Sequence, residues 1–137
     1  MPLHRRCAVK KISVIVPVYN MEMYFKVCME SIIKQSIFKD SELVCVNAGS
    51  TDGSLYVLRE YESHYDNLIL INHLNIEVGV AHNTEINAAS CEFVCFMDPD
   101  DYYLNSNSLE KFCTIRLHIN FYANTKNLLC QILSTKK

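Results

Sequence analysis

The sequence has no excess of basic residues, because 13 lysines and arginines stand against 15 acidic residues and the formal net charge is -2. Nucleic-acid binding therefore has no electrostatic support. No apolar run approaches the about 18 residues that a membrane span requires. The basic start is followed by an apolar run too short for a signal peptide, and no small-residue cleavage site follows. We therefore expect a cytoplasmic protein, with peripheral attachment to the inner face of the membrane left open.

The chain also lacks paired cysteines. Its seven cysteines are odd in number and include no C-x-x-C pair, which argues against a zinc cluster and against a disulfide framework. Cys45 and Cys95 stand inside apolar runs, where a free thiol behaves as a small hydrophobic side chain. The pattern fits a reducing compartment such as the cytoplasm.

Glycine is scarce, with three residues in the chain, and Gly49 and Gly53 are spaced as G-x-x-x-G. This is not the dinucleotide-binding fingerprint G-x-G-x-x-G, and no Gly-Lys-Ser/Thr follows as a Walker loop requires. Residues 47–53 instead place small polar turn formers after an apolar run. Two interpretations stay open: a loop that contacts a phosphate-bearing ligand, or an ordinary turn in which Thr51 or Asp52 caps the next helix.

The sequence does contain a regular alternation of apolar runs and amphipathic segments. The apolar runs predict four buried strands, at residues 11–16, 43–46, 68–71 and 93–97. Helical periodicity lies between them, at residues 23–35, on the face that carries Leu55, Leu58, Tyr61 and Tyr65, and from Gly79 to about Ala89. Wholly apolar strands that alternate with helices predict an α/β fold with a parallel sheet covered on both faces. The handedness of such crossovers favours a Rossmann-like three-layer sandwich, and we expect Pro17 to close its first strand.

Three acids follow the last predicted strand, in Asp98-Pro99-Asp100-Asp101. Ligands of open α/β sheets bind at the carboxyl ends of strands. Carboxylates together with substrate phosphates suit Mg²⁺ and Mn²⁺, and Pro99 fixes the backbone between two alternate acids. Asp98 and Asp100 are therefore candidate metal ligands. The alternative is a solvated acidic turn that also caps the following helix.

A third polar segment lies between the third and fourth predicted strands. Its Gly79 permits a close approach of the backbone to a ligand, and His82 and Asn83 could contact a base or a phosphate. A histidine at a helix start is also a common surface or capping residue, so this segment alone does not define a site.

Four segments taken in order are more specific than any one of them: V-I-V-P-V-Y-N, V-C-V-N-A-G-S-T-D-G-S, I-N-H-L-N-I-E-V-G-V-A-H-N and F-V-C-F-M-D-P-D-D-Y. This series resembles the family 2 glycosyltransferases of GT-A fold, the inverting, nucleotide-diphosphate-sugar-dependent enzymes of bacterial surface polysaccharide synthesis. The resemblance covers about residues 11–104. It implies a nucleotide-diphospho-sugar-binding region at 1–104, incomplete at its carboxyl end, and a helical or poorly ordered tail at 105–137 that begins with a polar turn and a helix near Leu109.

The resemblance also implies the roles of individual residues. The base would be bordered by Pro17, Tyr19 and Asn20, with Asn47, Gly49 and Ser50 nearby. Further nucleotide contacts would come from Gly79, His82 and Asn83. Asp98 would serve the ribose and the metal, Asp100 the metal, and Asp101 would support them. The implied donor is a UDP-sugar held through Mn²⁺ or Mg²⁺, and the implied acceptor is a glycan or a lipid-linked acceptor of surface polysaccharide or lipopolysaccharide.

Three departures from the family pattern weaken a direct transfer of the family's activity to this chain and leave alternatives without turnover open. Ala48 stands where relatives carry an acid that hydrogen-bonds the base, and His82 stands where relatives carry arginine. Inverting transfer needs a general base within reach of the acceptor, yet Glu110 is the only carboxylate after Asp101. The alternatives are a truncated, catalytically inactive fragment of such an enzyme, with a tail read out of frame, and a nucleotide-binding module used in protein interaction.

Overall fold

The computed structural model describes residues 12–73, 86–91 and 93–119, with side chains up to residue 113. Its elements in chain order are β1 (Ile12–Val18), α2 (Phe25–Ile33), the short 3-10 helix η1 (Phe38–Asp40), β2 (Ser41–Ala48), α3 (Ser54–His64), β3 (Leu68–His73), β4 (Val94–Phe96) and α5 (Ser108–Ile119).

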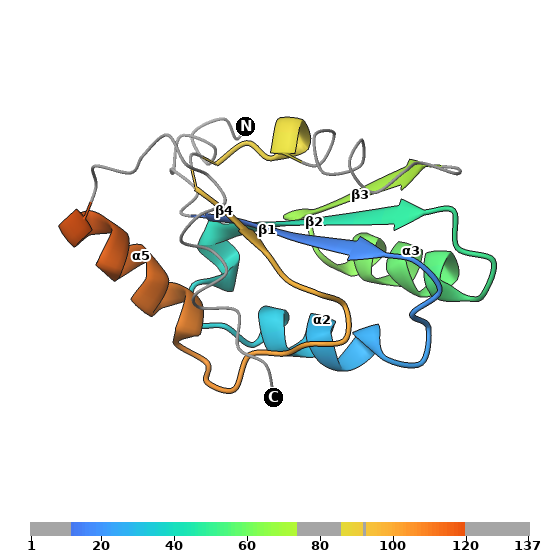
Figure 1. Ribbon diagram of the computed structural model, residues 1–137, viewed down its shortest axis with the longest axis horizontal. Coiled ribbons are helices and arrows are strands. Elements are labelled where there is room, and N and C mark those ends of the chain that lie inside the picture. The colour runs from blue at the N-terminus through green and yellow to red at the C-terminus, as the bar shows by residue number, and fades with distance from the viewer. Residues whose placement is uncertain (1–11, 74–85, 92, 120–137) are drawn as a thin grey trace.

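The four strands form one parallel sheet in the order β3-β2-β1-β4. Helices α2, α3 and α5 lie on one face of this sheet, and a short helical segment at residues 86–88 lies on the other (Figure 1). The predicted α/β, Rossmann-like arrangement with a parallel sheet is therefore confirmed. The predicted helix from Gly79 is seen here only in residues 86–88, because residues 74–85 lie outside the described part of the chain.

The strands read as continuous apolar runs because both faces of the sheet are buried. Alternate residues of β1, such as Val14 and Val16, pack with α2 and with Leu58 of α3 in one cluster. Ile15 and Val44 point to the opposite face and pack in a second cluster with Ala88 and other small or apolar residues. Because nearly every position of β1 and β2 is buried, their apolar residues have no reason to alternate with polar ones, whereas β3 at the edge of the sheet is partly exposed.

The first strand does not end at Pro17, and this expectation was wrong. β1 continues to Val18, and Pro17 pairs with Val46 of β2. The main chains of Ser13 and Ile15 hydrogen-bond toward β4. Main-chain groups two residues apart in a strand face the same neighbour, so the nitrogen of Pro17, which carries no hydrogen, also faces the β4 side. The pairing with β4 ends at Ile15 and Phe96. Pro17 therefore removes no bond from the ladder, as is usual for proline at a strand edge.

Helix α2 lies inside its predicted range, and α3 begins at Ser54, one residue before the predicted face. α2 is shorter than the predicted segment 23–35, and α3 buries Leu58 while Tyr61 and Tyr65 pack beside the same cluster. The helix predicted near Leu109 is α5, which adds Leu109 and Phe112 to the core. η1 was not predicted. A weaker helical pattern around Leu128 lies outside the described residues.

The loop from β4 to α5 is attached to the end of α2. The side chain of Gln35 donates to the main-chain oxygen of Asn105 at 2.7 Å and accepts from the main-chain N–H of Leu109 at 2.9 Å. The hydroxyl of Ser36 donates to the Glu110 carboxylate at 2.8 Å. Loop, helix and sheet thus form one packed unit. Within the described ranges, no helix is long and apolar enough to cross a membrane.

Candidate functional site

The strand order defines where a ligand site is expected. From β1 the chain adds β2 and β3 on one side of the sheet and then places β4 on the other side of β1. The carboxyl ends of β1 and β4 therefore flank the point where the strand order reverses, which is where open α/β sheets bind ligands. Three polar segments leave the sheet at this edge, at residues 19–22, 49–53 and 98–101.

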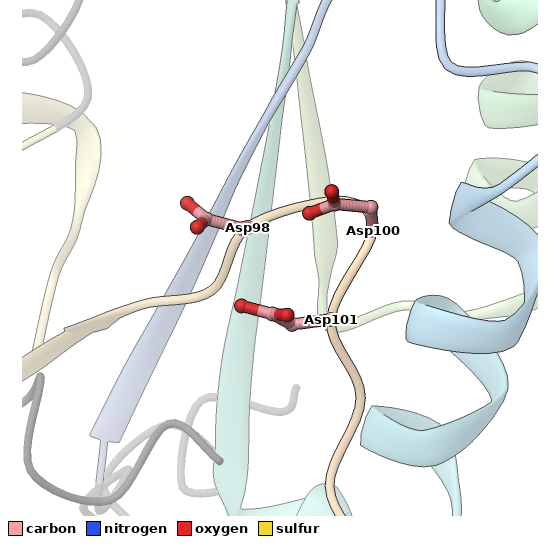
Figure 2. A group of neighbouring side chains, drawn as sticks. All are labelled: Asp98, Asp100 and Asp101. Atoms are coloured by element: carbon pink, nitrogen blue, oxygen red, sulfur yellow. The ribbon is translucent and has the colours of Figure 1, made fainter. Parts of the chain in front are cut away.

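The acids after β4 come together as predicted. One carboxylate oxygen each from Asp98, Asp100 and Asp101 can be chosen so that all lie within 4.8 Å of one another. In Figure 2 the carboxylates of Asp100 and Asp101 extend from the loop in the direction of Asp98. Asp98 and Asp100 are exposed, whereas Asp101 is only 2 % exposed. Exposed acids above a buried one present a set of hard oxygen donors, which suits Mg²⁺ or Mn²⁺.

This acidic loop is fixed to the fold at several points. The main-chain N–H of Asp101 donates to the main-chain oxygen of Asp98 at 3.0 Å, closing a tight turn. The main-chain N–H of Tyr103 donates to the Ser31 hydroxyl of α2 at 3.1 Å. Because α5 begins only at Ser108, the acids do not cap the next helix, and that part of the alternative interpretation is wrong.

The negative charge of this loop affects the pKa of Cys28 in α2. The pKa of its thiol is raised to about 12, mainly by burial and in smaller part by the nearby carboxylates of Asp101, Asp100 and Asp98. A negative charge on the sulfur would be both buried and close to three acids. Cys28 is therefore an inert thiol beneath the acidic loop.

The turn after β2 is held by side chains from the turn after β1. Asn20 accepts hydrogen bonds through its side-chain oxygen from the main-chain N–H groups of Thr51 at 2.7 Å and Asp52 at 3.3 Å. Its own main-chain N–H donates to the Ser50 hydroxyl at 2.9 Å. Glu22 accepts from the main-chain N–H of Gly53 at 2.8 Å. Two loops about thirty residues apart are thereby joined.

This turn does not offer its main-chain N–H groups to a phosphate. Residues 51, 52 and 53 donate to Asn20 and Glu22, and the N–H of Ser54 donates to the Asp52 carboxylate at 2.9 Å. A run of N–H groups at a helix start would otherwise attract an anion. The N-cap residue of α3 is Gly53, without a side-chain capping bond, so the interpretation in which Thr51 or Asp52 is the N-cap is wrong, although Asp52 accepts from the N–H of Ser54.

The pKa of Asp52 reflects these bonds. Desolvation is the largest single influence and raises the pKa of this carboxyl. The hydrogen bonds from the hydroxyl and main chain of Ser54, and from the main chain of Glu22 and of Asp52 itself, act in the opposite direction and together hold the pKa below its ordinary value. The charged form of Asp52 is therefore the one that fits the turn.

The remaining predicted residues of these two turns lie at the same edge but differ in exposure. The Tyr19 side chain is 57 % exposed, whereas Asn47 is buried at 1 %. The Asn47 amide donates to Asn72 of β3 at 2.8 Å, and its oxygen accepts from the main-chain N–H of Ser50 at 3.3 Å. Gly49 has a φ of 81°, which favours glycine. Asn47 thus supports the turn from below, and Tyr19 presents its ring to solvent.

Ala48 ends β2 half-buried, beside His73 of β3 in the strand register. A methyl group therefore lies where the resemblance predicts a base-binding acid. The predicted nucleotide contacts Gly79, His82 and Asn83 lie outside the described residues.

The sequence interpretation missed Glu22 and Asn72 as partners of the turn after β2. No short-range signal identifies them, because Glu22 and Gly53 are 31 positions apart and Asn47 and Asn72 are 25 apart. Only the pairing of neighbouring parallel strands brings these side chains together.

Comparison with known proteins identifies the family. The sequence profile of the family described as "Glycosyl transferase family 2" matches residues 13–114. The chain belongs to glycosyl transferase family 2. It is 42 % identical over 92 residues to the glycosyltransferase GlyA of Streptococcus pneumoniae serotype 4, which covers 67 % of this chain and 13 % of that protein. It is 38 % identical over 95 residues to the poly(ribitol-phosphate) beta-glucosyltransferase of Bacillus spizizenii, with 67 % and 15 % covered. The chain thus spans about a seventh of the length of these relatives.

Solved structures of family 2 and GT-A type proteins share the fold. Residues 1–349 of S. aureus TarS in complex with UDP match with a TM-score of 0.71 and 32 % identity, over 80 % of this chain and 33 % of that one. The mannosyltransferase PcManGT of Pyrobaculum calidifontis, in complex with GDP-Man and Mn²⁺, matches with a TM-score of 0.67 and 27 % identity, over 76 % and 31 %. The family 2 glycosyltransferase character and the GT-A, Rossmann-like fold of this chain are therefore established.

Proposed function

We propose that this chain is the donor-binding region of a family 2 glycosyltransferase and binds a UDP-sugar through Mn²⁺ or Mg²⁺. The observation that carries the proposal is the convergence of Asp98, Asp100 and Asp101 at the carboxyl end of β4, beside the end of β1. UDP is present in the matching complex of TarS, and Mn²⁺ with GDP-Man in that of PcManGT.

The two sides of the proposed site would bind different parts of the ligand: the metal with the diphosphate, and the base. On the β4 side, Asp98 and Asp100 would hold the metal, with buried Asp101 as support. Such a metal neutralises the charge that grows on a departing diphosphate. On the other side, the exposed Tyr19 ring and the turn at Gly49 and Ser50 would border the base. Since the N–H groups of residues 51–54 are engaged within the chain, the diphosphate is directed to the metal.

Neither the sequence nor the described part of the structure assigns a residue that would activate the acceptor. Glu110, the only carboxylate after Asp101, accepts a hydrogen bond from Ser36 at the end of α2, so nothing assigns it as a general base. We therefore expect the 137-residue chain to bind a donor without transferring the sugar on its own. The acceptor of the complete reaction would be a surface glycan or a lipid-linked acceptor, reached at the inner face of the membrane.

Calorimetry with UDP and Mn²⁺ tests the proposal. The wild-type chain is expected to bind UDP only with the metal present, and Asp100→Asn is expected to weaken this binding by about tenfold or more, because a metal–carboxylate contact is lost. Asp66→Asn is the matched control, since Asp66 is an exposed acid before β3 and distant from the β4 loop in the chain. Its affinity should equal that of the wild type.

Two results would overturn the proposal. One is the absence of any UDP binding by the folded wild-type chain at millimolar nucleotide and metal. The other is an unchanged affinity in Asp100→Asn. Transfer of labelled sugar to a glycan or lipid-linked acceptor by the isolated chain would contradict the expectation of donor binding without turnover.

A further inference from the structure

Asn20 stands between the two sides of the proposed site. It lies two residues after the end of β1, the strand that pairs with β2 on one side and with β4 on the other. Its φ of 50° lies in the left-handed region, which asparagine tolerates better than other residues with a side chain. This backbone conformation turns the chain sharply at the end of β1.

The side chain and the main chain of Asn20 bind the same partner segment. The side-chain oxygen accepts from the main-chain N–H groups of Thr51 and Asp52, and also lies 3.4 Å from the Thr51 hydroxyl. The main-chain N–H donates to Ser50. Asn20 therefore contributes several of the hydrogen bonds that hold the turn at residues 50–52, beside those of Asn47 with Ser50 and of Glu22 with Asp52, and its side chain does so through an oxygen acceptor.

We propose that Asn20 is a positioning residue for the nucleotide: it holds the turn at residues 50–52 in its binding geometry and does not itself contact the ligand through its amide nitrogen. This inference rests on the proposed function. It differs from the role implied by the resemblance, in which Asn20 borders the base. The essential properties at position 20 are then tolerance of positive φ and one side-chain oxygen.

Two substitutions separate these properties. Asn20→Gly keeps the tolerance of positive φ and removes the oxygen, whereas Asn20→Asp keeps an oxygen in the same place and removes the amide nitrogen. Loss of the two main-chain hydrogen bonds is expected to weaken UDP binding in the presence of Mn²⁺ by about tenfold in Asn20→Gly. Asn20→Asp should stay within about threefold of the wild type, because its carboxylate accepts the same bonds.

The control measurements separate positioning from a general loss of structure. Mn²⁺ binding in the absence of UDP should be equal in all variants, since the proposed metal ligands lie on the loop after β4 and Asn20 lies on the loop after β1. Asn107→Gly, an exposed turn position before α5, controls for an asparagine-to-glycine change as such and should bind UDP normally. Exchange of the amide hydrogens of Thr51 and Asp52 should accelerate in Asn20→Gly and not in Asn20→Asp.

The outcomes are distinguishable. Rescue by Asn20→Asp with weakened binding in Asn20→Gly supports the proposal. Equal weakening in both variants would assign a direct contact to the amide nitrogen and overturn it, as would normal UDP binding in Asn20→Gly. If the wild-type chain binds no UDP at all, the proposed function has failed, and the amide exchange rates still report whether Asn20 holds the turn.

Discussion

The hydroxyl of Ser13 donates a 2.7 Å hydrogen bond to the carboxylate of Glu42 inside the sheet, where the two residues are register partners on β1 and β2. Ser13 is fully buried, and Glu42 is 6 % exposed. Ser90 donates to the same carboxylate through both its main-chain N–H, at 2.8 Å, and its hydroxyl, at 2.7 Å. Three donors thus satisfy one buried acid at the amino-terminal end of the strands, and attach the segment before β4 to the sheet.

Removal of this acid should destabilise the fold. Glu42→Ala leaves the buried hydroxyl of Ser13 and two donors of the exposed Ser90 without their acceptor, and we expect a loss of about 1–3 kcal/mol in the free energy of unfolding. Glu42→Gln keeps one acceptor oxygen and should lose less. Urea unfolding measures both, with Glu62→Ala as the control at an exposed position of α3. A loss in Glu42→Ala no larger than in the control would contradict this role.

Gly53 lies in close contact with the carboxylate of Glu22, while its backbone, with a φ of -82°, would accept other residues. A methyl group built on Gly53 would lie 2.7 Å from the carboxyl carbon of Glu22. Gly53→Ala must therefore displace Glu22 and weaken its bond to the main-chain N–H of residue 53, at a cost of about 1 kcal/mol. In a Glu22→Ala background the clash is absent, and the same substitution should be neutral. Equal losses in both backgrounds, measured by urea unfolding, would exclude the contact.

Asp52 should make stability depend on pH in the acidic range. Its pKa is lowered in the folded state, so its stabilising contribution is complete above the ordinary pKa of about 3.9 and is lost as the pH falls through the folded value. The stability difference between the wild type and Asp52→Asn should therefore shrink between pH 5 and pH 2. Most of the decrease is expected between the ordinary pKa of Asp52 and its lowered pKa in the folded state. Asp66→Asn serves as the control. A difference that grows on acidification would reverse the assigned sign.

Two of the buried thiols, those of Cys28 in α2 and Cys45 in β2, should be unreactive in the folded protein. Burial raises the pKa of Cys28 to about 12 and moves that of Cys45 in the same direction, and only the thiolate is nucleophilic. Brief treatment with N-ethylmaleimide at pH 8, followed by peptide mass mapping, should leave both unmodified, while treatment in concentrated urea should modify both. The half-buried Cys113 of α5 is the internal comparison. Rapid native modification of Cys28 would show that the acidic loop opens.

Restoring an acid at position 48 should strengthen recognition of the base. Ala48 ends β2 where the resemblance implies a base-binding carboxylate, and one such hydrogen bond would tighten UDP binding by about tenfold in Ala48→Asp. Pyrophosphate with Mn²⁺ contains no base, so its affinity should not rise. An equal gain for both ligands would indicate an electrostatic effect on the metal instead.

The sequence predicted the sheet well because burial on both faces produces strands that are apolar throughout. The ends of β1, β2 and β3 were predicted too short for a physical reason, whereas the fourth strand was predicted two residues too long. Ser41 and Glu42 begin β2, and Asn72 and His73 end β3, where polar side chains take part in a ladder that is formed by the main chain. Hydrophobic patterning detects side-chain burial and is blind to these backbone pairs. The prediction that Pro17 ends the first strand failed for a similar reason. Proline is tolerated there because the pairing of β1 with β4 has already ended at Ile15.

The site was predictable on its acidic side and not on its other side. Alternate acids after a strand are a local pattern, and the structure brings Asp98 and Asp100 together as expected. The network of Asn20 and Glu22 with the turn after β2 depends instead on contacts between residues about thirty positions apart. Such contacts follow from strand order, which no local spacing encodes.

The position of β4 links the acidic loop to the order of folding. β2 pairs with β1 and with β3, its neighbours in the chain. β4, the last strand in the sequence, pairs instead with β1, the first. Closure of so distant a pair is the slow, entropically costly part of assembling a parallel sheet. A cation held by Asp98 and Asp100 would then bind only the finished sheet and would stabilise it by mass action. Metal affinity would thus depend on the pairing of β4 with β1, the contact in the sheet that joins the most distant parts of the chain.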